Sequence, residues 1–234
     1  MRTANAELFD FIVVGAGSSG ATLAARLSES GAHRVLLLEA GTEGSGYFWS
    51  RVPVGVSKMI DLPAVNWCFT SEPDEGSGGR RIEVPRGKML GGSSSINGMV
   101  YIRGQAEDFD HWRQLGNEGW SYQDVLPFFR KAENNETLKD DYHGTGGPLN
   151  VAEQRSPLPI NEAFLKACEQ AGHKRIKDFN GATQEGVGFY QVTHRDGSRC
   201  SVARAYIYGR NRPNLHVITD ATVLRVTFDG KGGA

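Results

Sequence analysis

The chain has 234 residues, and its 26 lysine and arginine residues against 27 aspartate and glutamate residues give a formal net charge of −1. This balance excludes a general polyanion binder, because neutralising phosphates takes a strong excess or a patch of basic residues. Charged residues make up 23% of the chain and hydrophobic residues 39%, which is typical of a folded protein. Glycine, with 30 residues, is the anomaly, since its usual share is only about 7%.

The sequence also bears on compartment, membranes and metals. No stretch approaches the roughly 18 consecutive apolar residues of a membrane span, and the first residues lack the apolar segment of a secretory signal. Cys68, Cys168 and Cys200 are far apart and predict free thiols in a reducing compartment. We therefore expect a cytoplasmic protein with no integral membrane segment, with peripheral membrane association left open. The six histidines are too widely spaced to favour a metal site.

The first forty residues predict a strand–helix–strand unit. Residues 8–14 are apolar and rich in β-branched side chains, typical of a buried strand. They lead into a G-x-G-x-x-G motif at Gly15–Gly20, then into helix-forming residues at 21–29. Residues 34–39 predict a second buried strand, and its terminal acid follows Gly20 at close to the spacing of about 20 residues expected for a ribose-binding carboxylate.

Each part of this unit has a physical task in binding a dinucleotide. Gly15 permits the tight turn, Gly17 lets main-chain amides approach a pyrophosphate, and Gly20 lets the helix pack closely on the strand. Glu39 can accept hydrogen bonds from both ribose hydroxyls and would repel a 2′-phosphate, which favours NAD or FAD over NADP. A strand–helix turn without a ligand is the alternative, and this unit alone does not separate NAD from FAD.

A second glycine-rich segment lies at residues 85–99. Its composition would suit a flexible linker, yet Arg86 and Lys88 precede it and the apolar residues 99–102 follow without a break. Runs of small residues let main-chain amides reach a planar or phosphate-bearing ligand. A second such loop, remote from the first, therefore indicates a long, extended cofactor.

These segments resemble the glucose–methanol–choline (GMC) flavin oxidoreductases. The Gly15–Glu39 unit, continuing into Ala40-Gly41, is similar to their N-terminal unit. Residues 87–110 match the family's first signature, Gly-Lys-x-Leu-Gly-Gly-Ser-Ser-x-Ile-Asn, followed at the proper spacing by Tyr101, Gly104 and Asp110. Weaker similarities lie at Asn66-Trp67, His143-Gly144 and Asn214-Leu215. The resemblance covers the whole chain and is greatest to the choline and aliphatic-alcohol dehydrogenase branch.

The resemblance implies an FAD site. It assigns one group of residues to the ADP half of FAD: Gly15, Gly17, Ser19, Gly20 and Glu39. It assigns a second group to the pyrophosphate-to-flavin side: Arg86, Gly91, Ser94, Asn97, Gly98, Met99 and Val100. Val223 matches a position whose main chain meets the adenine. Some relatives attach FAD through a histidine immediately before the signature asparagine; Ile96 stands there in this chain, so we expect non-covalent FAD.

The implied fold class is α/β: a Rossmann-like FAD-binding domain with part of a second, α+β substrate-binding domain, that is, a truncated GMC fold. The expected domains are residues 1–139 for the first segments of the FAD-binding domain, 140–195 for the first part of the substrate-binding domain, and 196–234 for an incomplete return to the FAD-binding domain. No repeat or low-complexity tract interrupts them.

The remaining chain predicts further elements. Helices are expected at 108–115, 122–133 and 161–171, strands at 149–151, 188–192 and 222–228, a polar surface connection at 134–147 and a hairpin turn at Asp229-Gly230. The expected buried residues of these helices are Trp112, Leu126, Phe128, Phe129, Ala163, Phe164, Ala167 and Cys168. We further expect His143 in a turn, with an active-site approach as the alternative, and His194 in an ordinary surface or hydrogen-bonded role. Trp67 is expected in the core, with stacking on a ligand as the alternative, and Cys68 is expected as a small buried hydrophobe, with contact to the flavin region as the alternative.

For an intact enzyme the resemblance implies oxidation of a CH–OH group: a histidine base takes the hydroxyl proton while hydride passes from carbon to flavin N5. The family's acid/base pair lies beyond residue 234, and a strand at 222–228 would lack its partner, so we expect a chain cut in mid-fold that is inactive alone. We nominate no catalytic residue and regard a second chain carrying the remainder as a plausible partner. The alternatives are a hydroxynitrile-lyase-like relative with structural flavin and a non-catalytic NAD-binding module. The alcohol and the electron acceptor stay open.

Overall fold

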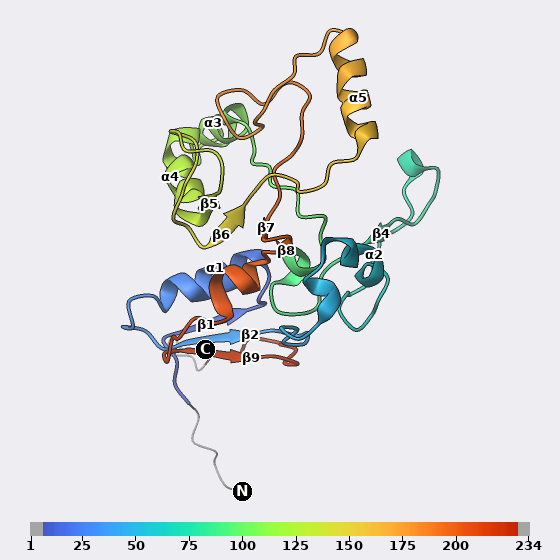
Figure 1. The fold of residues 1–234 in the computed structure, drawn as a ribbon. Coiled ribbons are helices and arrows are strands. Elements are labelled where there is room, and N and C mark those ends of the chain that lie inside the picture. Colours follow the sequence, from blue (N-terminus) through green and yellow to red (C-terminus); the bar gives the residue numbers. More distant parts are fainter. Residues whose placement is uncertain (1–6, 229–234) are drawn as a thin grey trace, which may run out of the picture. The chain divides into compact units, whose positions relative to one another are not determined.

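The computed structural model describes residues 7–228, which form two compact units (Figure 1). The first unit comprises the chain up to Gly98 and the chain from Ser201 onward, and the second comprises Met99–Cys200. The units therefore do not divide at residues 139 and 195. Contact-based units and the domains of a longer protein are different divisions, so those domain boundaries stay a prediction.

A three-stranded parallel sheet forms the centre of the first unit. Its strands are β1 (Phe11–Val14), β2 (Val35–Leu38) and β9 (Leu215–Ile218), in the order β1-β2-β9. The predicted strand–helix–strand unit is present, because α1 (Ser18–Leu27) connects β1 to β2. β9 was not predicted, because the strand in this part of the chain was predicted at residues 222–228 instead. It pairs with β2 in register, with Val35 opposite Leu215.

One face of this sheet carries the main core. Figure 1 shows α1 lying over the sheet, and a π-helical turn, η5 (Ala203–Ile207), packs beside α1. The buried residues that meet there are Val13, Ala16, Ala24, Val35, Leu37, Leu90 and Ala203. The other face of β1 is open in the described part of the chain, because Ile12 and Val14 are about half exposed. The prediction of a buried strand is therefore wrong for this face of β1.

The first unit also contains a second, smaller core and several short elements. That core consists of Met59, Val65, Met89 and Ile96. The short elements are the helical turns η1 (Phe48–Ser50), η2 (Pro53–Gly55), α2 (Val56–Met59), η3 (Glu75–Ser77) and η4 (Gly92–Ser95), and the antiparallel strands β3 (Phe69–Thr70) and β4 (Glu83–Val84).

Residues 222–228 are described but form no strand, so that prediction is wrong. Leu224, Val226 and Phe228 are exposed. A β-strand needs a neighbour to pair its backbone groups, and no described strand lies against this segment. The predicted turn at Asp229-Gly230 lies outside the described residues.

The second unit begins with two packed helices, α3 (Ala106–Gln114) and α4 (Tyr122–Ala132), close to their predicted ranges. Capping boxes start both helices, from Gln105 and Ser121. Phe109 and Phe129 meet edge to face between them, with ring centroids 5.5 Å apart. Leu126 and Phe129 are half-buried, whereas Trp112 and Phe128 are exposed, contrary to prediction. The two helices bury a narrow seam only.

The third predicted helix is α5 (Pro159–Gln170), and its buried face differs from the prediction. Leu165 is the buried residue, Cys168 is half-buried, and Ala163, Phe164 and Ala167 are exposed. Among the described residues α5 packs through a single row, so helical periodicity alone did not identify the side that would be covered.

Short strands complete the second unit. β5 (Glu133–Asn135) pairs in parallel with β6 (Leu149–Val151), and β7 (His194–Arg195) forms a hairpin with β8 (Ser198–Arg199). β6 lies where it was predicted. The predicted strand at 188–192 is reduced to isolated bridges at Val192, and the predicted surface connection at 134–147 instead starts in β5 and includes buried residues.

A buried ion pair holds β5 in place. An Nη atom of Arg103 lies 2.6 Å from a carboxylate oxygen of Glu133, and these side chains are 2% and 0% exposed. The other partners of the Glu133 carboxylate are the amide N–H of Gly144 and the side-chain amide of Asn135. Two buried charges are stable only when they are paired and hydrogen-bonded, and this pair meets both conditions.

His143 is fully buried beside this pair and follows a turn, as predicted. Its Nδ1 lies 2.7 Å from Asp140 Oδ1, and its Nε2 lies 3.7 Å from Asp178 Oδ2. Burial by itself lowers the pKa of His143, but the carboxylates of Asp178, Asp140 and Glu133 outweigh burial and raise the pKa above its ordinary value. His194 is also buried, and its Nε2 lies 3.0 Å from the carbonyl oxygen of Glu153, an ordinary hydrogen-bonded role.

Candidate functional site

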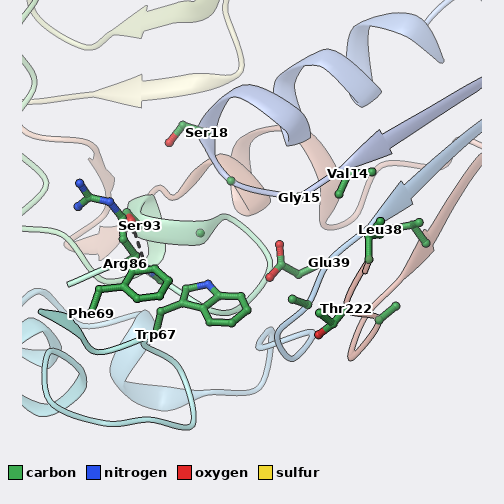
Figure 2. A pocket seen from close by; sticks show the side chains of 16 residues that line it. Val14, Gly15, Ser18, Leu38, Glu39, Trp67, Phe69, Arg86, Ser93 and Thr222 are labelled. Atoms are coloured by element: carbon green, nitrogen blue, oxygen red, sulfur yellow. Dashed lines mark hydrogen bonds between the residues drawn. The ribbon is translucent and has the colours of Figure 1, made fainter. Parts of the chain in front are cut away.

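A cavity of about 640 Å³ opens in the first unit at the carboxyl ends of β1 and β2 (Figure 2). In an open parallel sheet this end is where ligands bind. The cavity is lined by three sequence regions that are far apart: Val14, Gly15, Gly17, Ser18, Leu38, Glu39 and Ala40; Trp67, Phe69, Arg86, Gly87, Gly92 and Ser93; and Ala221, Thr222 and Val223.

The first glycine loop forms one wall of the cavity. Gly15 has φ +88°, a conformation that suits glycine, and its N–H donates to the carbonyl of Leu38 at 2.7 Å. Gly17 is the N-cap of α1, where no side chain caps the helix and no acidic residue occupies the first turn. A Cβ built on Gly17 would meet no atom within 4 Å. The amino end of α1 therefore opens onto free space, as an anion site requires.

Gly20 faces the strand instead of the cavity. A Cβ at this position would lie 1.9 Å from the carbonyl oxygen of Gly15 and 3.3 Å from a methyl carbon of Val13. The absence of a side chain at Gly20 is what lets the first turn of α1 sit against the end of β1.

Glu39 is a buried carboxylate at the end of β2, only 5% exposed. One carboxylate oxygen accepts from the N–H of Ala16 and the other from the N–H of Gly41, both at 2.8 Å. Each carboxylate oxygen has a second lone pair, so further donors can still bind. Glu39 thus ties the glycine loop to the end of β2 and also borders the cavity.

The second glycine loop lies directly against the first. The N–H of Gly91 donates to the carbonyl of Ala16 at 2.8 Å, and a Cβ on Gly92 would stand 2.7 Å from the Cα of Gly17. Behind this contact, Leu90 N–H donates to the carbonyl of Thr42. Two segments about 75 residues apart in sequence therefore share one groove wall.

A basic side chain borders the cavity next to this contact. Arg86 is the cation among the lining residues. Its main-chain N–H donates to Asn66 Oδ1 at 2.8 Å. The N–H of Gly87 donates to the hydroxyl of Ser93 at 3.1 Å, which fixes the start of the second loop. A positive charge and the amino end of α1 on one cavity suit an anionic ligand.

Trp67 and Phe69 form what we call the aromatic floor of the cavity (Figure 2). Their rings are parallel within 6°, with centroids 5.7 Å apart. Trp67 is 39% exposed and Phe69 51% exposed, so the expectation that Trp67 belongs to the core is wrong. Cys68, between them, is also exposed, contrary to prediction, and all three cysteines are free thiols.

The predicted cofactor residues are divided by the structure. Five of them line the cavity: Gly15, Gly17, Glu39, Arg86 and Val223. Six others belong to the same unit but do not line it: Ser19, Gly20, Gly91, Ser94, Asn97 and Gly98. Met99 and Val100 belong to the second unit. Sequence reasoning missed Ser18, Gly92 and Ser93, although the two motifs contain them, and Leu38, Ala221 and Thr222, which carry no motif signal.

Two charged side chains, Glu39 and Arg86, line the cavity in the described part of the chain. Glu39 is the carboxylate among the lining residues, and no histidine lines the cavity in the described part of the chain. No group of three metal-ligating side chains occurs among residues 7–228, and no helix in that range has the length and apolar character to cross a bilayer. An extended, anionic ligand that meets a buried carboxylate is what this arrangement can hold.

Comparison with known proteins agrees with this geometry. A model of the GMC oxidoreductase family matches residues 9–234. The chain belongs to the GMC oxidoreductase family. Among curated GMC relatives, the oxygen-dependent choline dehydrogenase of Rhizobium rhizogenes (strain K84) is 44% identical over 210 residues, which are 89% of this chain and 38% of the relative. That of Sinorhizobium fredii is 46% identical over 212 residues, again 89% and 38%.

A solved GMC-like structure, pyridoxine 4-oxidase from Mesorbium loti, has a TM-score of 0.85 and 34% identity, covering 90% of this chain and 42% of that one. An FAD-dependent oxidoreductase from Chaetomium thermophilum has a TM-score of 0.81 and 31% identity, covering 90% and 38%. The chain thus spans about two fifths of the length of the relatives it matches.

Proposed function

We propose that the cavity binds the ADP part of a non-covalent FAD and that the protein to which this chain belongs oxidises a CH–OH group of a small alcohol. The observation that carries the proposal is the contact of the two glycine loops, Gly91 N–H to the carbonyl of Ala16, beside the buried Glu39. The free space next to Gly17 is the position that a pyrophosphate would take.

In this proposal the turn at Gly15 positions the main-chain amides at Gly17 and Ser19 and the amino end of α1 to hold the pyrophosphate, with Arg86 adding a positive charge. Glu39 accepts from the ribose hydroxyls, and the main chain at Val223 meets the adenine. The segment toward the flavin consists of Gly91, Ser94, Asn97, Gly98, Met99 and Val100. Gly20 has an indirect role, since it sets how closely α1 approaches β1.

When bound, FAD would supply the acceptor for a hydride leaving the alcohol carbon. The chain's own residues bind and orient the cofactor. We propose that the acid/base pair for the alcohol hydroxyl comes from a part of the protein outside these residues, in this polypeptide or in a second chain. This is supported by the length of the relatives, since the chain spans 38% of the choline dehydrogenase of Rhizobium rhizogenes.

We take choline as the first substrate to test, because the curated relatives at 44–46% identity are named choline dehydrogenases. The pyridoxine 4-oxidase at 34% identity makes pyridoxine the second substrate to test.

The three free thiols favour a reducing, cytoplasmic compartment.

The test has two stages. The 234-residue chain is titrated with FAD and with NAD, and the bound nucleotide is released by acid precipitation. We expect FAD to bind, NAD not to bind, and all yellow colour to stay in the supernatant; flavin in the pellet would contradict non-covalent binding. The full-length protein is then mixed with choline without oxygen. Bleaching of the flavin supports alcohol oxidation, whereas an unbleached flavin with every alcohol tested would favour a structural flavin as in a lyase.

A further inference from the structure

Both aromatic side chains of the aromatic floor are exposed at the cavity. Trp67 and Phe69 line the same cavity as Gly15, Gly17 and Glu39, yet 39% of Trp67 and 51% of Phe69 are exposed. An exposed pair of aromatic side chains beside a polar loop is a feature of ligand sites, because a planar ligand can cover the rings.

The floor is held in place before any ligand arrives. The main-chain N–H of Trp67 donates to the carbonyl of Arg86 at 2.8 Å, and Phe69 pairs with Val84 between β3 and β4. The ammonium of Lys88 lies 4.8 Å from the centre of the Trp67 ring, a cation–π contact. A ligand that packs on this indole therefore loses little free energy to ordering it.

The position of the floor indicates which half of a dinucleotide it meets. Figure 2 shows the indole of Trp67 extending toward Glu39, with Phe69 on the side nearer Arg86. Under the proposed function Glu39 holds the ribose of the adenosine, and Val223 lies at the adenine. Of the two rings, Trp67 is thus the one nearer the adenosine end.

We propose that Trp67 is a binding residue for the adenosine half of the cofactor, packing its indole against the adenine and its ribose. This inference rests on the proposed function, since it assumes that the cavity holds FAD. Stacking of a base on an aromatic side chain is worth about 1–3 kcal/mol by truncation, so the variant Trp67→Leu should bind FAD ~10-fold more weakly.

The experiment separates contact from mere proximity. In a variant with Trp49, Trp112 and Trp120 replaced by phenylalanine, Trp67 is the one remaining tryptophan of the sequence. ADP has no flavin to take up the excitation energy, so a change in Trp67 emission that ADP causes and inorganic pyrophosphate does not cause reports the nucleoside at the indole. We expect ADP to quench the emission and shift it to shorter wavelength, and inorganic pyrophosphate, which reaches only the glycine loop, to leave it unchanged.

Affinity gives the second measurement. FAD and ADP are titrated against the wild-type chain, Trp67→Leu and the control Trp120→Leu, whose tryptophan is similarly exposed but belongs to the second unit. The inference predicts loss of affinity in Trp67→Leu alone. If the wild type and Trp67→Leu bind FAD equally and ADP leaves Trp67 emission unchanged, the inference is wrong and the proposed function stands.

If the wild type binds neither FAD nor ADP, the proposed function itself fails, and the inference with it. Circular dichroism shows whether Trp67→Leu is folded. Should it not be, the single-tryptophan variant decides: emission that responds to ADP supports the inference, and emission that does not respond overturns it.

Discussion

The carboxylate of Glu39 offers the sharpest test of how the site is built, because it both borders the cavity and holds the glycine loop. In the variant Glu39→Gln one carboxylate oxygen becomes an NH₂ group. The amide can still accept from either Ala16 N–H or Gly41 N–H, but the other N–H then faces a donor. Both bonds are 2.8 Å long and lie at a residue that is 5% exposed.

The magnitude follows from these two bonds. A hydrogen bond to a charged group contributes about 1.5–3 kcal/mol, and a buried donor left unpaired costs about 1–3 kcal/mol. One bond is lost and the other becomes neutral, so the free energy of unfolding of the first unit should fall by about 2–4 kcal/mol. That is a large part of the stability of a small domain, about 5–15 kcal/mol.

Urea unfolding followed by tryptophan emission measures this loss. Replacing Trp112 and Trp120 by phenylalanine leaves Trp49 and Trp67, so the emission reports on the first unit alone. The matched control is Glu29→Gln, whose carboxylate pairs with Arg26 on the surface of α1. We expect the control to change stability by less than about 1 kcal/mol. Equal stability of Glu39→Gln and the control would refute the role assigned to Glu39.

Three further predictions concern packing and charge. Gly20→Ala should destabilise the first unit in urea unfolding, because its Cβ would lie 1.9 Å from the carbonyl oxygen of Gly15; unchanged stability would refute this packing role. Glu133→Gln should lower the free energy of unfolding of the second unit by about 3–5 kcal/mol, because Arg103 stays buried without its counter-charge; a loss below about 1 kcal/mol would contradict this. The pKa of His143 is raised in the folded chain, so its stabilisation is full below about pH 6.5, the unfolded value, and is lost as the pH rises through the folded value. The free energy of unfolding of the wild type, measured in urea, should therefore be lower at about pH 8 than at about pH 6. The variant His143→Gln should lose the part of this pH dependence that comes from His143.

Local sequence signals predicted the elements whose residues are neighbours in the chain. β1, α1 and β2 lie where short apolar runs, a helical pattern and the glycine motif predicted them, and α3, α4 and β6 also match. These patterns work because hydrogen bonding within a helix, and the turn at Gly15, depend on residues a few positions apart. The two glycine loops were identified as parts of one site from their composition and their resemblance to the GMC family.

Only the tertiary structure decided which side chains are covered and by what. Trp67 lines the cavity instead of the core, and Glu133, at the end of the helix predicted at 122–133, is buried against Arg103. The predicted strand at 222–228 is absent, and β9 pairs with β2. Each outcome depends on a partner far away in sequence: burial follows from what packs against a residue, and a strand exists only beside another strand. Periodicity along the chain shows that a face is apolar, whereas the element that covers it is determined by the fold.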